Sequence, residues 1–469
     1  MLANYKHQEQ VLERSKDRPE YAFYMEPGTG KSRVTIKTAE YWYNEYSMDL
    51  MIIVGPKSMI PTWSRIEIPK HRELECLVYE WKGIYSDRQV RQFNLFVEQK
   101  GKMLLYFICN IDALIHDRFK NVVGNLIKRI PNFGIAIDEA TSIKSLRADR
   151  TQEAFILGDK AIMRRILTGS PIVQGPLDLF AQAQFLKKGL LGYSNYYSFK
   201  TRYAEIRPQR YGTRTFEKIV GYRDLDDLRS RVLKYASIIK LDECVDLPER
   251  VFKQVSVELT DEQKVAYDDL KSKAIAYIQG HEVTAINVLA MVTRLLQIVA
   301  GQLKIRENVY VSLKNNRLEA LKQSVDECND QCLIWCPYVQ SARDIAEFLG
   351  KEAIHASSNY GIDERQEVFD SFRAGNYKSL IMNPQSAGHG LTLIEASTSL
   401  YYTNGYNLEH RIHSLARNYR LGQTKKTLVV DYVSPGTLEL QVLKALLDKE
   451  QLANRVVGKQ AALDLIGAT

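Results

Sequence analysis

The feature that most constrains the fold is an alternation of short apolar segments with helix-like segments, which occurs in two separate series. The apolar segments of the first series are Tyr21–Met25, Leu50–Val54, Met103–Cys109, Gly134–Ile137 and Arg165–Leu167. Those of the second series are Leu333–Cys336, Ala353–His355, Ser379–Met382, Thr398–Tyr402 and Thr427–Tyr432. Short apolar runs followed by turns and helices are typical of parallel strands buried on both faces. Each series therefore predicts an α/β lobe with a doubly wound parallel sheet.

The pattern changes between the two series. Residues 176–236 indicate helices joined by loops rich in Tyr, Arg and Lys, and residues 261–300 show helical periodicity. Leu247-Pro248 is a plausible joint between the halves. We expect an N-terminal lobe over 1–240 with a helical insertion at about 176–236. The C-terminal lobe is expected over 241–469, with a helical insertion at about 261–310.

Composition excludes several classes of protein. Hydrophobic residues make up 45% of the 469 residues, which is too many for a wholly disordered chain. The formal net charge of +8 permits a polyanionic partner without demanding one. The longest apolar runs are far too short to cross a bilayer, and the N-terminus lacks an apolar signal core, so we expect no membrane association.

The six cysteines do not form a disulfide framework in so long a chain. Cys328, Cys332 and Cys336 are spaced four apart, which raises the question of a metal site. Cys332 and Cys336 flank or lie on an apolar strand, and no fourth ligand of matching spacing follows. We therefore interpret these cysteines as reduced core thiols.

A compact phosphate-binding loop follows the first apolar segment. Its sequence is Glu26-Pro27-Gly28-Thr29-Gly30-Lys31-Ser32, and it lacks the first glycine of the common spacing. Glycines let backbone N–H groups converge on phosphate oxygens, and the following helix presents its positive end. Lys31 is expected to bind the β- and γ-phosphates of ATP and Ser32 to hold Mg²⁺. The alternative is a glycine turn beside an ordinary lysine.

Two acids, Asp138 and Glu139, end the apolar segment Phe133–Ile137. Adjacent acids at the carboxyl end of a strand need a cation or a proton to share the site. Asp138 suits contact with Mg²⁺, and Glu139 suits polarisation of the attacking water. The alternative is a solvated acidic turn. That alternative would leave unexplained why a phosphate-binding loop and an acid pair both occur, in the order expected for one site.

Several further segments, taken together, resemble a known family. In the first half these segments are Tyr5-Lys6-His7-Gln8, Ile53-Val54-Gly55-Pro56 with Trp63 and Glu67, Asp138-Glu139-Ala140-Thr141, and Leu167-Thr168-Gly169-Ser170-Pro171-Ile172. In the second half they are Ile354–Ser357 with Arg365, Ser386–Leu393, and His413–Gln423. The chain thereby resembles the Swi/Snf family of superfamily-two helicase-related ATPases, closest to the distant branch that includes annealing helicases. The resemblance implies two RecA-like lobes with helical insertions, and a bacterial or phage member fits so compact a chain.

Some positions depart from the family pattern. His413 stands where the family has a glutamine, and Tyr406 and Leu408 replace the usual Trp and Pro of its "WNP" segment. We expect these changes to concern the coupling of the lobes rather than the binding of ATP.

The resemblance also implies roles for further residues around ATP, which the family binds between its lobes. Gln8 would read the adenine edge with Tyr5 nearby, although both could belong to a fraying helix. Arg417 and Arg420, three apart on a predicted helix, would reach the γ-phosphate when the lobes close. Gly390 would lie close to the nucleotide. The residues expected to couple nucleotide to DNA are Thr168, Gly169, Ser170 and Gly388.

The expected macromolecular partner is double-stranded DNA, contacted through its phosphates. Candidate contacts are Lys57, Ser58, Thr62, Asn110, Lys144, Arg365 and Gln385. The stretch 193–223 is rich in Tyr and basic residues. Two alternatives are open for it: a further DNA-binding segment, or a segment whose aromatic side chains pack helices together.

We therefore predict a duplex-DNA translocase that uses ATP and Mg²⁺. A strand-separating or branch-migrating helicase is a close alternative, and a nucleotide-switched DNA-binding scaffold without turnover is the alternative of another class. We expect a monomer in the bacterial or phage-infected cytoplasm, or in a nucleus if the source is eukaryotic. Replication, recombination or repair proteins are the expected protein partners.

Overall fold

The computed structural model describes residues 5–84, 86–211, 214–244, 247–280, 285–306, 309–357, 359–385 and 391–457. The chain divides into two compact units, Met1–Val245 with Lys449–Thr469 and Asp246–Asp448. Each unit is built around its own parallel sheet.

The first unit contains a seven-stranded sheet of order β3-β4-β2-β5-β6-β1-β9, in which every pairing is parallel. Its strands are β1 (Glu20–Met25), β2 (Leu50–Gly55), β3 (Cys76–Glu80), β4 (Leu104–Asn110), β5 (Phe133–Asp138), β6 (Met163–Thr168) and β9 (Ala236–Ile239). The five strands predicted from the sequence are therefore present. The two outermost strands, β3 and β9, were not predicted.

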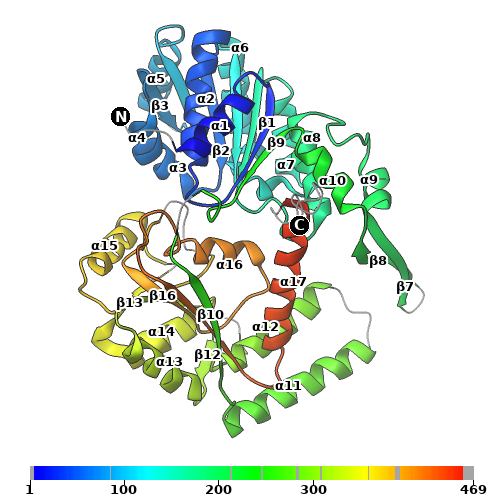
Figure 1. The fold of residues 1–469 in the computed structure, drawn as a ribbon, viewed down its shortest axis with the longest axis vertical. Coiled ribbons are helices and arrows are strands. Elements are labelled where there is room, and N and C mark those ends of the chain that lie inside the picture. Colours follow the sequence, from blue (N-terminus) through cyan, green and yellow to red (C-terminus); the bar gives the residue numbers. More distant parts are fainter. Residues whose placement is uncertain are drawn as a thin grey trace. The chain divides into compact units, whose positions relative to one another are not determined.

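Helices cover both faces of this sheet (Figure 1). Alternate side chains of β1 enter different cores: Phe23 packs with α1 (Lys6–Ser15) and α2 (Lys31–Tyr46), whereas Tyr24 packs with the helices of the opposite face. The other helices of 3 to 13 residues, the π-helix η1 included, are α3 (Met59–Thr62), η1 (Trp63–Glu67), α4 (Ile68–His71), α5 (Asp87–Val97), η2 (Ile111–Ile115), α6 (Asp117–Arg129), η3 (Ala140–Ile143), α7 (Asp149–Gly158), η4 (Pro176–Asp178), α8 (Leu179–Leu186), α9 (Tyr196–Tyr203) and α10 (Leu225–Val232). This arrangement confirms the doubly wound class of fold.

The insertion expected at about 176–236 is not wholly helical. Between α9 and α10 the chain forms an antiparallel hairpin of β7 (Ala204–Tyr211) and β8 (Arg214–Tyr222). The prediction of helices and loops is therefore wrong over this segment. The strand periodicity is hard to see in the sequence because charged residues separate the few apolar positions. Among the described side chains, those that pack against the core lie at the base of the hairpin, at Ala204, Ile206, Ile219 and Tyr222.

The second unit contains a six-stranded, entirely parallel sheet of order β10-β17-β16-β13-β15-β14. Its strands are β10 (Arg250–Ser256), β13 (Gln331–Trp335), β14 (Ala353–Ala356), β15 (Ser379–Met382), β16 (Ala396–Tyr401) and β17 (Thr427–Val433). Leu333 and Trp335 face one core while Cys332 and Ile334 face the other, so this sheet is also packed on both faces. The strand not predicted, β10, lies at the edge of the sheet and is largely exposed.

The insertion expected at about 261–310 contains α11 (Asp261–Gly280) and α12 (Ala285–Val299), followed by the hairpin β11 (Gln302–Arg306) and β12 (Val309–Ser312). The remaining helices of this unit are α13 (Asn316–Glu327), α14 (Val339–Leu349), η5 (Gly350–Glu352), α15 (Ile362–Arg373) and α16 (Leu408–Leu415).

The last helix, α17 (Glu439–Val457), begins in the second unit, and its residues from Lys449 onward belong to the first. Leu452 packs against the first unit's core. The division into compact units thus differs from the predicted boundary at 240/241, which kept 449–469 in the C-terminal lobe. A single long helix that is shared by two cores gives no sequence signal at the point where its packing changes.

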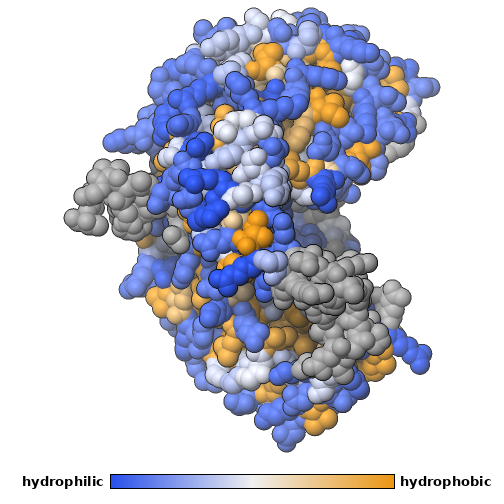
Figure 2. All heavy atoms as spheres, turned by 90° about the vertical axis from the view of Figure 1, so that its right-hand side faces the viewer, coloured by the Kyte–Doolittle hydropathy of each residue, from blue (hydrophilic) through white to orange (hydrophobic). Residues whose placement is uncertain are grey.

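None of the helices within the described ranges is long and apolar enough to cross a membrane. On the face drawn in Figure 2, hydrophilic residues predominate and hydrophobic ones are scattered among them.

Candidate nucleotide-binding site

The phosphate-binding loop joins β1 to α2 in the first unit. Gly28 and Gly30 adopt φ values of 89° and 95°, which glycine reaches without the steric cost of a side chain. Gly30 is the N-cap of α2, so Lys31 and Ser32 stand in the first turn of a 16-residue helix. The Lys31 Nζ donates to the carbonyl oxygen of Met25 at 2.7 Å, which folds the ammonium group back over the loop. Backbone N–H groups and an ammonium group at a helix N-terminus form a site suited to phosphate.

Helix α1 packs its N-terminal end against this loop. The Gln8 Nε2 donates to the carbonyl oxygen of Thr29 at 3.2 Å, and a ring nitrogen of His7 lies 2.8 Å from the same oxygen. A Cβ at Gly30 would lie only 2.2 Å from the Gln8 Nε2, so a side chain there would displace the Gln8 amide. Tyr5 stacks on His7 and stays 45% exposed. The predicted residues Tyr5 and Gln8 are therefore brought to the loop, together with His7, for which no role was predicted.

Glu26 of the loop has a structural contact that the sequence did not predict. Its Oε2 accepts a hydrogen bond from the backbone N–H of Leu241 at 3.0 Å, beyond the end of β9. The Thr29 hydroxyl donates to the Glu26 carbonyl at 2.7 Å. These bonds fix the loop between β1 and β9, and ATP contact by Glu26 stays a prediction.

Asp138 and Glu139 lie at the carboxyl end of β5, and both are buried. Burial, followed by the neighbouring Glu139 carboxylate, raises the pKa of Asp138 to about 6, while Trp63, Lys31 and a backbone N–H act in the opposite direction. Glu139 adopts φ +48°, a left-handed conformation that is uncommon for glutamate. A buried carboxylate pair with an unfavourable charge and a strained backbone is typical of a functional site, and it fits a divalent cation.

Two residues in contact with Asp138, Trp63 and Gly55, had no individual role in the predictions from the sequence. The Trp63 Nε1 donates to the Asp138 Oδ2 at 2.8 Å. A Cβ at Gly55 would lie 3.2 Å from the Asp138 Cβ and 3.1 Å from its carbonyl oxygen, so the chain passes close to the acid there. Trp63 lies on η1, a π-helix, a form frequently found at functional sites.

The predicted coupling residues of the first unit also meet the loop. A Cβ at Gly169 would lie 2.7 Å from the Pro27 Cδ and 3.3 Å from the Glu26 Cα. The Thr168 hydroxyl accepts a hydrogen bond from the Ser170 backbone N–H at 3.0 Å. A movement of the phosphate-binding loop would therefore displace the turn after β6, because the two segments are in close contact.

The first-unit candidates for DNA contact follow the carboxyl ends of parallel strands. Lys57 and Ser58 are exposed in the turn after β2, and Asn110 ends β4 in register with Gly55. Thr62 ends α3, and Lys144 follows η3. All of them therefore belong to the edge of the sheet that also holds the loop and the acids.

In the second unit, one sequence prediction is wrong. Helix α16 ends at Leu415, so Arg417 and Arg420 lie beyond it rather than on one helical face. Their side chains nevertheless converge, since the Nη1 of Arg417 and the Nη1 of Arg420 donate to the Leu391 carbonyl at 3.1 and 2.9 Å. The helix ends early because Arg417 is buried and its Nε bonds the His413 carbonyl at 2.8 Å.

The other predicted residues of this unit are dispersed. The Arg365 Nε donates to the Ser357 carbonyl at 3.2 Å, and Gln385 is exposed after β15. Gly388 and Gly390 lie outside the described residues.

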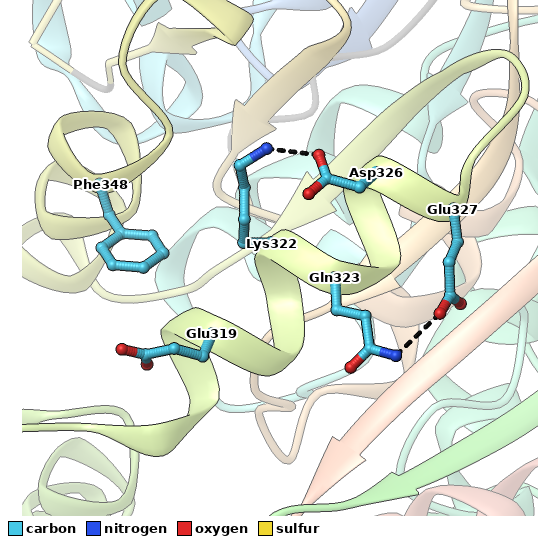
Figure 3. A pocket seen from close by; sticks show the side chains of 6 residues that line it. All are labelled: Glu319, Lys322, Gln323, Asp326, Glu327 and Phe348. Atoms are coloured by element: carbon cyan, nitrogen blue, oxygen red, sulfur yellow. Dashed lines mark hydrogen bonds and ion pairs between the residues drawn. The ribbon is translucent and has the colours of Figure 1, made fainter.

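A surface hollow of about 490 Å³ lies between α13 and α14 (Figure 3). It is lined by Phe348 and by side chains of α13, among which Lys322 pairs with Asp326 and Gln323 bonds Glu327 at 2.9 Å. None of the motif residues lines it, so we do not assign the nucleotide to this hollow.

With this geometry in place, comparison with known proteins defines the class. Residues 21–308 match the SNF2-related domain, and residues 316–422 match the helicase conserved C-terminal domain. The first match alone covers more than half of the chain, so the chain belongs to the SNF2-related family of helicase-like ATPases. Membership confirms the predicted family and the prediction that the chain is an enzyme of the ATP-hydrolysing class.

Several individual proteins are similar to the chain. YwqA of Bacillus subtilis is 25% identical over 337 residues, which are 69% of this chain and 35% of YwqA. The ISWI chromatin-remodeling complex ATPase ISW2 of Saccharomyces cerevisiae is 23% identical over 93% of this chain and 39% of its own length. Protein p41 of the Acyrthosiphon pisum secondary endosymbiont phage 1 is 24% identical over 71% of this chain and 72% of p41. The chain thus spans little more than a third of two of these relatives.

Among solved structures, the Sulfolobus solfataricus SWI2/SNF2 ATPase core in complex with dsDNA is 21% identical to this chain. The match covers 97% of this chain and 93% of that one, with a TM-score of 0.42.

Proposed function

We propose that this chain is a DNA-stimulated ATPase that translocates along double-stranded DNA. The observation that supports this most is the convergence, at one edge of the first sheet, of a phosphate-binding loop, a buried acid pair and a coupling turn packed against that loop. The curated relative ISW2 is named an ATPase of a chromatin-remodeling complex, which agrees with a motor acting on DNA.

The described residues fit Mg²⁺ and ATP. The loop offers N–H donors and the Lys31 ammonium group, and Asp138 and Ser32 offer hard oxygen ligands of the kind that Mg²⁺ prefers. When bound, Mg²⁺ would neutralise charge that develops on the transferring phosphoryl group.

The protein's own groups have distinct roles in this proposal. Lys31 binds the phosphates, Trp63 orients the Asp138 carboxylate, and Glu139 orients and polarises the attacking water. The resemblance assigns Arg417 and Arg420 to the γ-phosphate in a closed state of the two lobes. Their permanent charge and planar donors suit that role.

Contact with DNA is proposed to be sequence-independent. Exposed Lys57 and Ser58, with Asn110 and Lys144, follow the same strand ends as the nucleotide residues, so movement of that edge would be transmitted to the DNA phosphates. We further propose that the chain acts as a monomer in the cytoplasm of a bacterial or phage-infected cell. Replication, recombination or repair proteins would then choose its targets.

Two assays separate translocation from strand separation. A translocase displaces the third strand of a triplex in an ATP-dependent manner without unwinding a forked duplex. Unwinding of the fork would instead support the helicase alternative. ATP-dependent DNA binding without hydrolysis or displacement would support the nucleotide-switched scaffold.

A further inference from the structure

The β7–β8 hairpin forms a separate two-stranded sheet in the first unit. In Figure 1 it extends from α9 and α10, away from the seven-stranded sheet. Among the side chains that the structure describes, those at its base pack against the core: Ala204, Ile206, Ile219 and Tyr222. A two-stranded ribbon is marginally stable by itself, so the charged residues beyond this apolar base are better explained by a ligand than by packing.

The sequence of this hairpin is strongly basic. Residues 204–223 contain five Lys and Arg, at 207, 210, 214, 218 and 223, against two acids, Glu205 and Glu217. Glu217 is already paired with Lys200 of α9 at 2.6 Å. The sequence of the hairpin therefore carries an excess of positive charge.

Two of these basic residues lie directly opposite each other. Arg207 of β7 is the register partner of Lys218 of β8, and both side chains are exposed. Over the part of the chain that the structure describes, neither forms an ion pair with an acid. Like charges at directly opposed strand positions destabilise a ribbon, and a bound polyanion would convert that repulsion into attraction.

The base of the hairpin offers a place for such an anion. A hollow of about 340 Å³ is lined by Arg207 and Arg223, together with Thr201, Ala204, Glu205, Ile206 and Val220. The Arg223 side chain is held in place, since its Nε donates to the Arg202 carbonyl at 3.1 Å and its Nη2 to the Thr201 carbonyl at 2.8 Å. A guanidinium fixed in this way loses little freedom when it binds phosphate.

We propose that the β7–β8 hairpin is an arm that binds the phosphate backbone of duplex DNA through Arg207, Lys218 and Arg223. A two-stranded ribbon is narrow enough to lie along a groove of duplex DNA, with phosphates on either side. This inference rests on the proposed DNA-dependent function and adds a contact surface outside the motifs of the family. The arm increases affinity for DNA, while the ATP site is unaffected by it.

The test compares duplex binding by wild type and by Arg207→Gln/Lys218→Gln across a series of salt concentrations. Each phosphate contact contributes a slope of about 0.9 in log K against log salt, so two lost contacts lower the slope by about 1.8. Salt contributes little to binding at 1 M, and 0.1 M lies one decade of salt concentration below it. A slope of about 0.9 per contact over that decade corresponds to a roughly eightfold loss of affinity at 0.1 M salt for each contact removed. ATP hydrolysis without DNA should stay at the wild-type rate.

Arg207→Glu sharpens the test. It places an acid opposite Lys218 and replaces a repulsive pair with an attractive one, so the hairpin should become no less stable while DNA binding falls further. Loss of binding in a folded, unimpaired ATPase supports the arm.

The matched control, Arg88→Gln/Arg91→Gln, removes the same charge from exposed positions on α5. An equal loss of binding in this control would show an effect of net charge alone and overturn the proposal. Wild-type affinity in both hairpin variants would also overturn it. The charges would then serve only to prevent the exposed strand edges from pairing with strands of other molecules. Preference for RNA over duplex DNA through the same residues would reject DNA as the ligand. If wild type itself binds no DNA, the proposed function fails, which is a separate result.

Discussion

The indole N–H of Trp63 donates a hydrogen bond to the carboxylate of Asp138 at 2.8 Å, with both residues buried. These residues are 75 positions apart in the sequence, and they connect a π-helix to the acid that is the proposed Mg²⁺ ligand. A carboxylate held by a fixed donor meets a metal ion in one orientation, which lowers the cost of binding.

Trp63→Phe should raise the Mg²⁺ concentration needed for half-maximal ATP hydrolysis by about tenfold or more, as expected when an outer partner of a metal ligand is lost. A Mg²⁺ titration at saturating ATP measures this effect. Trp42→Phe is the matched control, because the Trp42 Nε1 also donates a hydrogen bond, to the Lys16 carbonyl at 2.5 Å, away from the acid pair. Equal Mg²⁺ dependence in the two variants would remove Trp63 from the site.

Glu139→Gln should retain nucleotide binding while hydrolysis falls by about 10²-fold or more, because the amide cannot accept a proton from water. Binding of a fluorescent ATP analogue and single-turnover hydrolysis separate the two effects. Lost binding in this variant would indicate that Glu139 is structural.

The backbone of Glu139 allows a companion test. Its φ of +48° is unfavourable for glutamate and neutral for glycine, so Glu139→Gly should unfold at an equal or higher temperature than wild type, although it is inactive. A clear loss of thermal stability would show that the carboxylate holds the fold rather than the substrate.

His71 should make the first unit sensitive to mild acid. Burial, followed by Lys70, Arg33 and Lys37, lowers the pKa of His71 to about 4 from an ordinary value of 6.5, despite Glu67 at 3.6 Å. Protonation thus favours the unfolded chain, so the stabilising contribution is complete above pH 6.5 and is lost as the pH falls toward 4. His71→Gln should reduce the drop in urea midpoint over this range, whereas His116→Gln, at an exposed position, should not. Equal pH profiles in the two variants would contradict this assignment.

The second unit depends on a buried ion pair. The Arg317 Nη2 and the Glu439 Oε2 lie 2.6 Å apart, and the two side chains are 1% and 4% exposed. Glu439→Gln leaves a buried guanidinium without its charge partner and should cost about 3–5 kcal/mol of unfolding free energy. Asp269→Asn, which breaks the exposed pair with Lys273, should cost less than about 0.5 kcal/mol.

Urea unfolding measures both changes. The double variant Arg317→Met/Glu439→Leu should recover most of the loss, because it removes both buried charges together. If the double variant is no more stable than Glu439→Gln, the hydrogen bonds of the pair, rather than its charge balance, stabilise the contact between α13 and α17.

The central strands of both sheets were predicted from the sequence, but of the four outermost strands, β3, β9, β10 and β14, only β14 was predicted. Central strands such as β2 and β5 are buried on both faces and appear as continuous apolar runs. The edge strand β10 is mostly exposed, so its sequence lacks that signal.

The site shows the same division. The residues of the loop and the acid pair lie on contiguous motifs, so their chemistry could be predicted. The contact of Trp63 with Asp138, and of His7 with Thr29, exists only after distant segments fold together. The end of α16 before Arg417 was not predicted, because a buried arginine that bonds backbone carbonyls has no periodic signature.

The most direct test of the central claim is the steady-state rate of ATP hydrolysis with no nucleic acid, with single-stranded DNA, with RNA and with duplex DNA. The proposed motor should be stimulated most strongly by duplex DNA, and Lys31→Ala should show no hydrolysis above background with any of them. A rate that duplex DNA leaves unchanged, or hydrolysis that persists without the Lys31 ammonium group, would contradict this account.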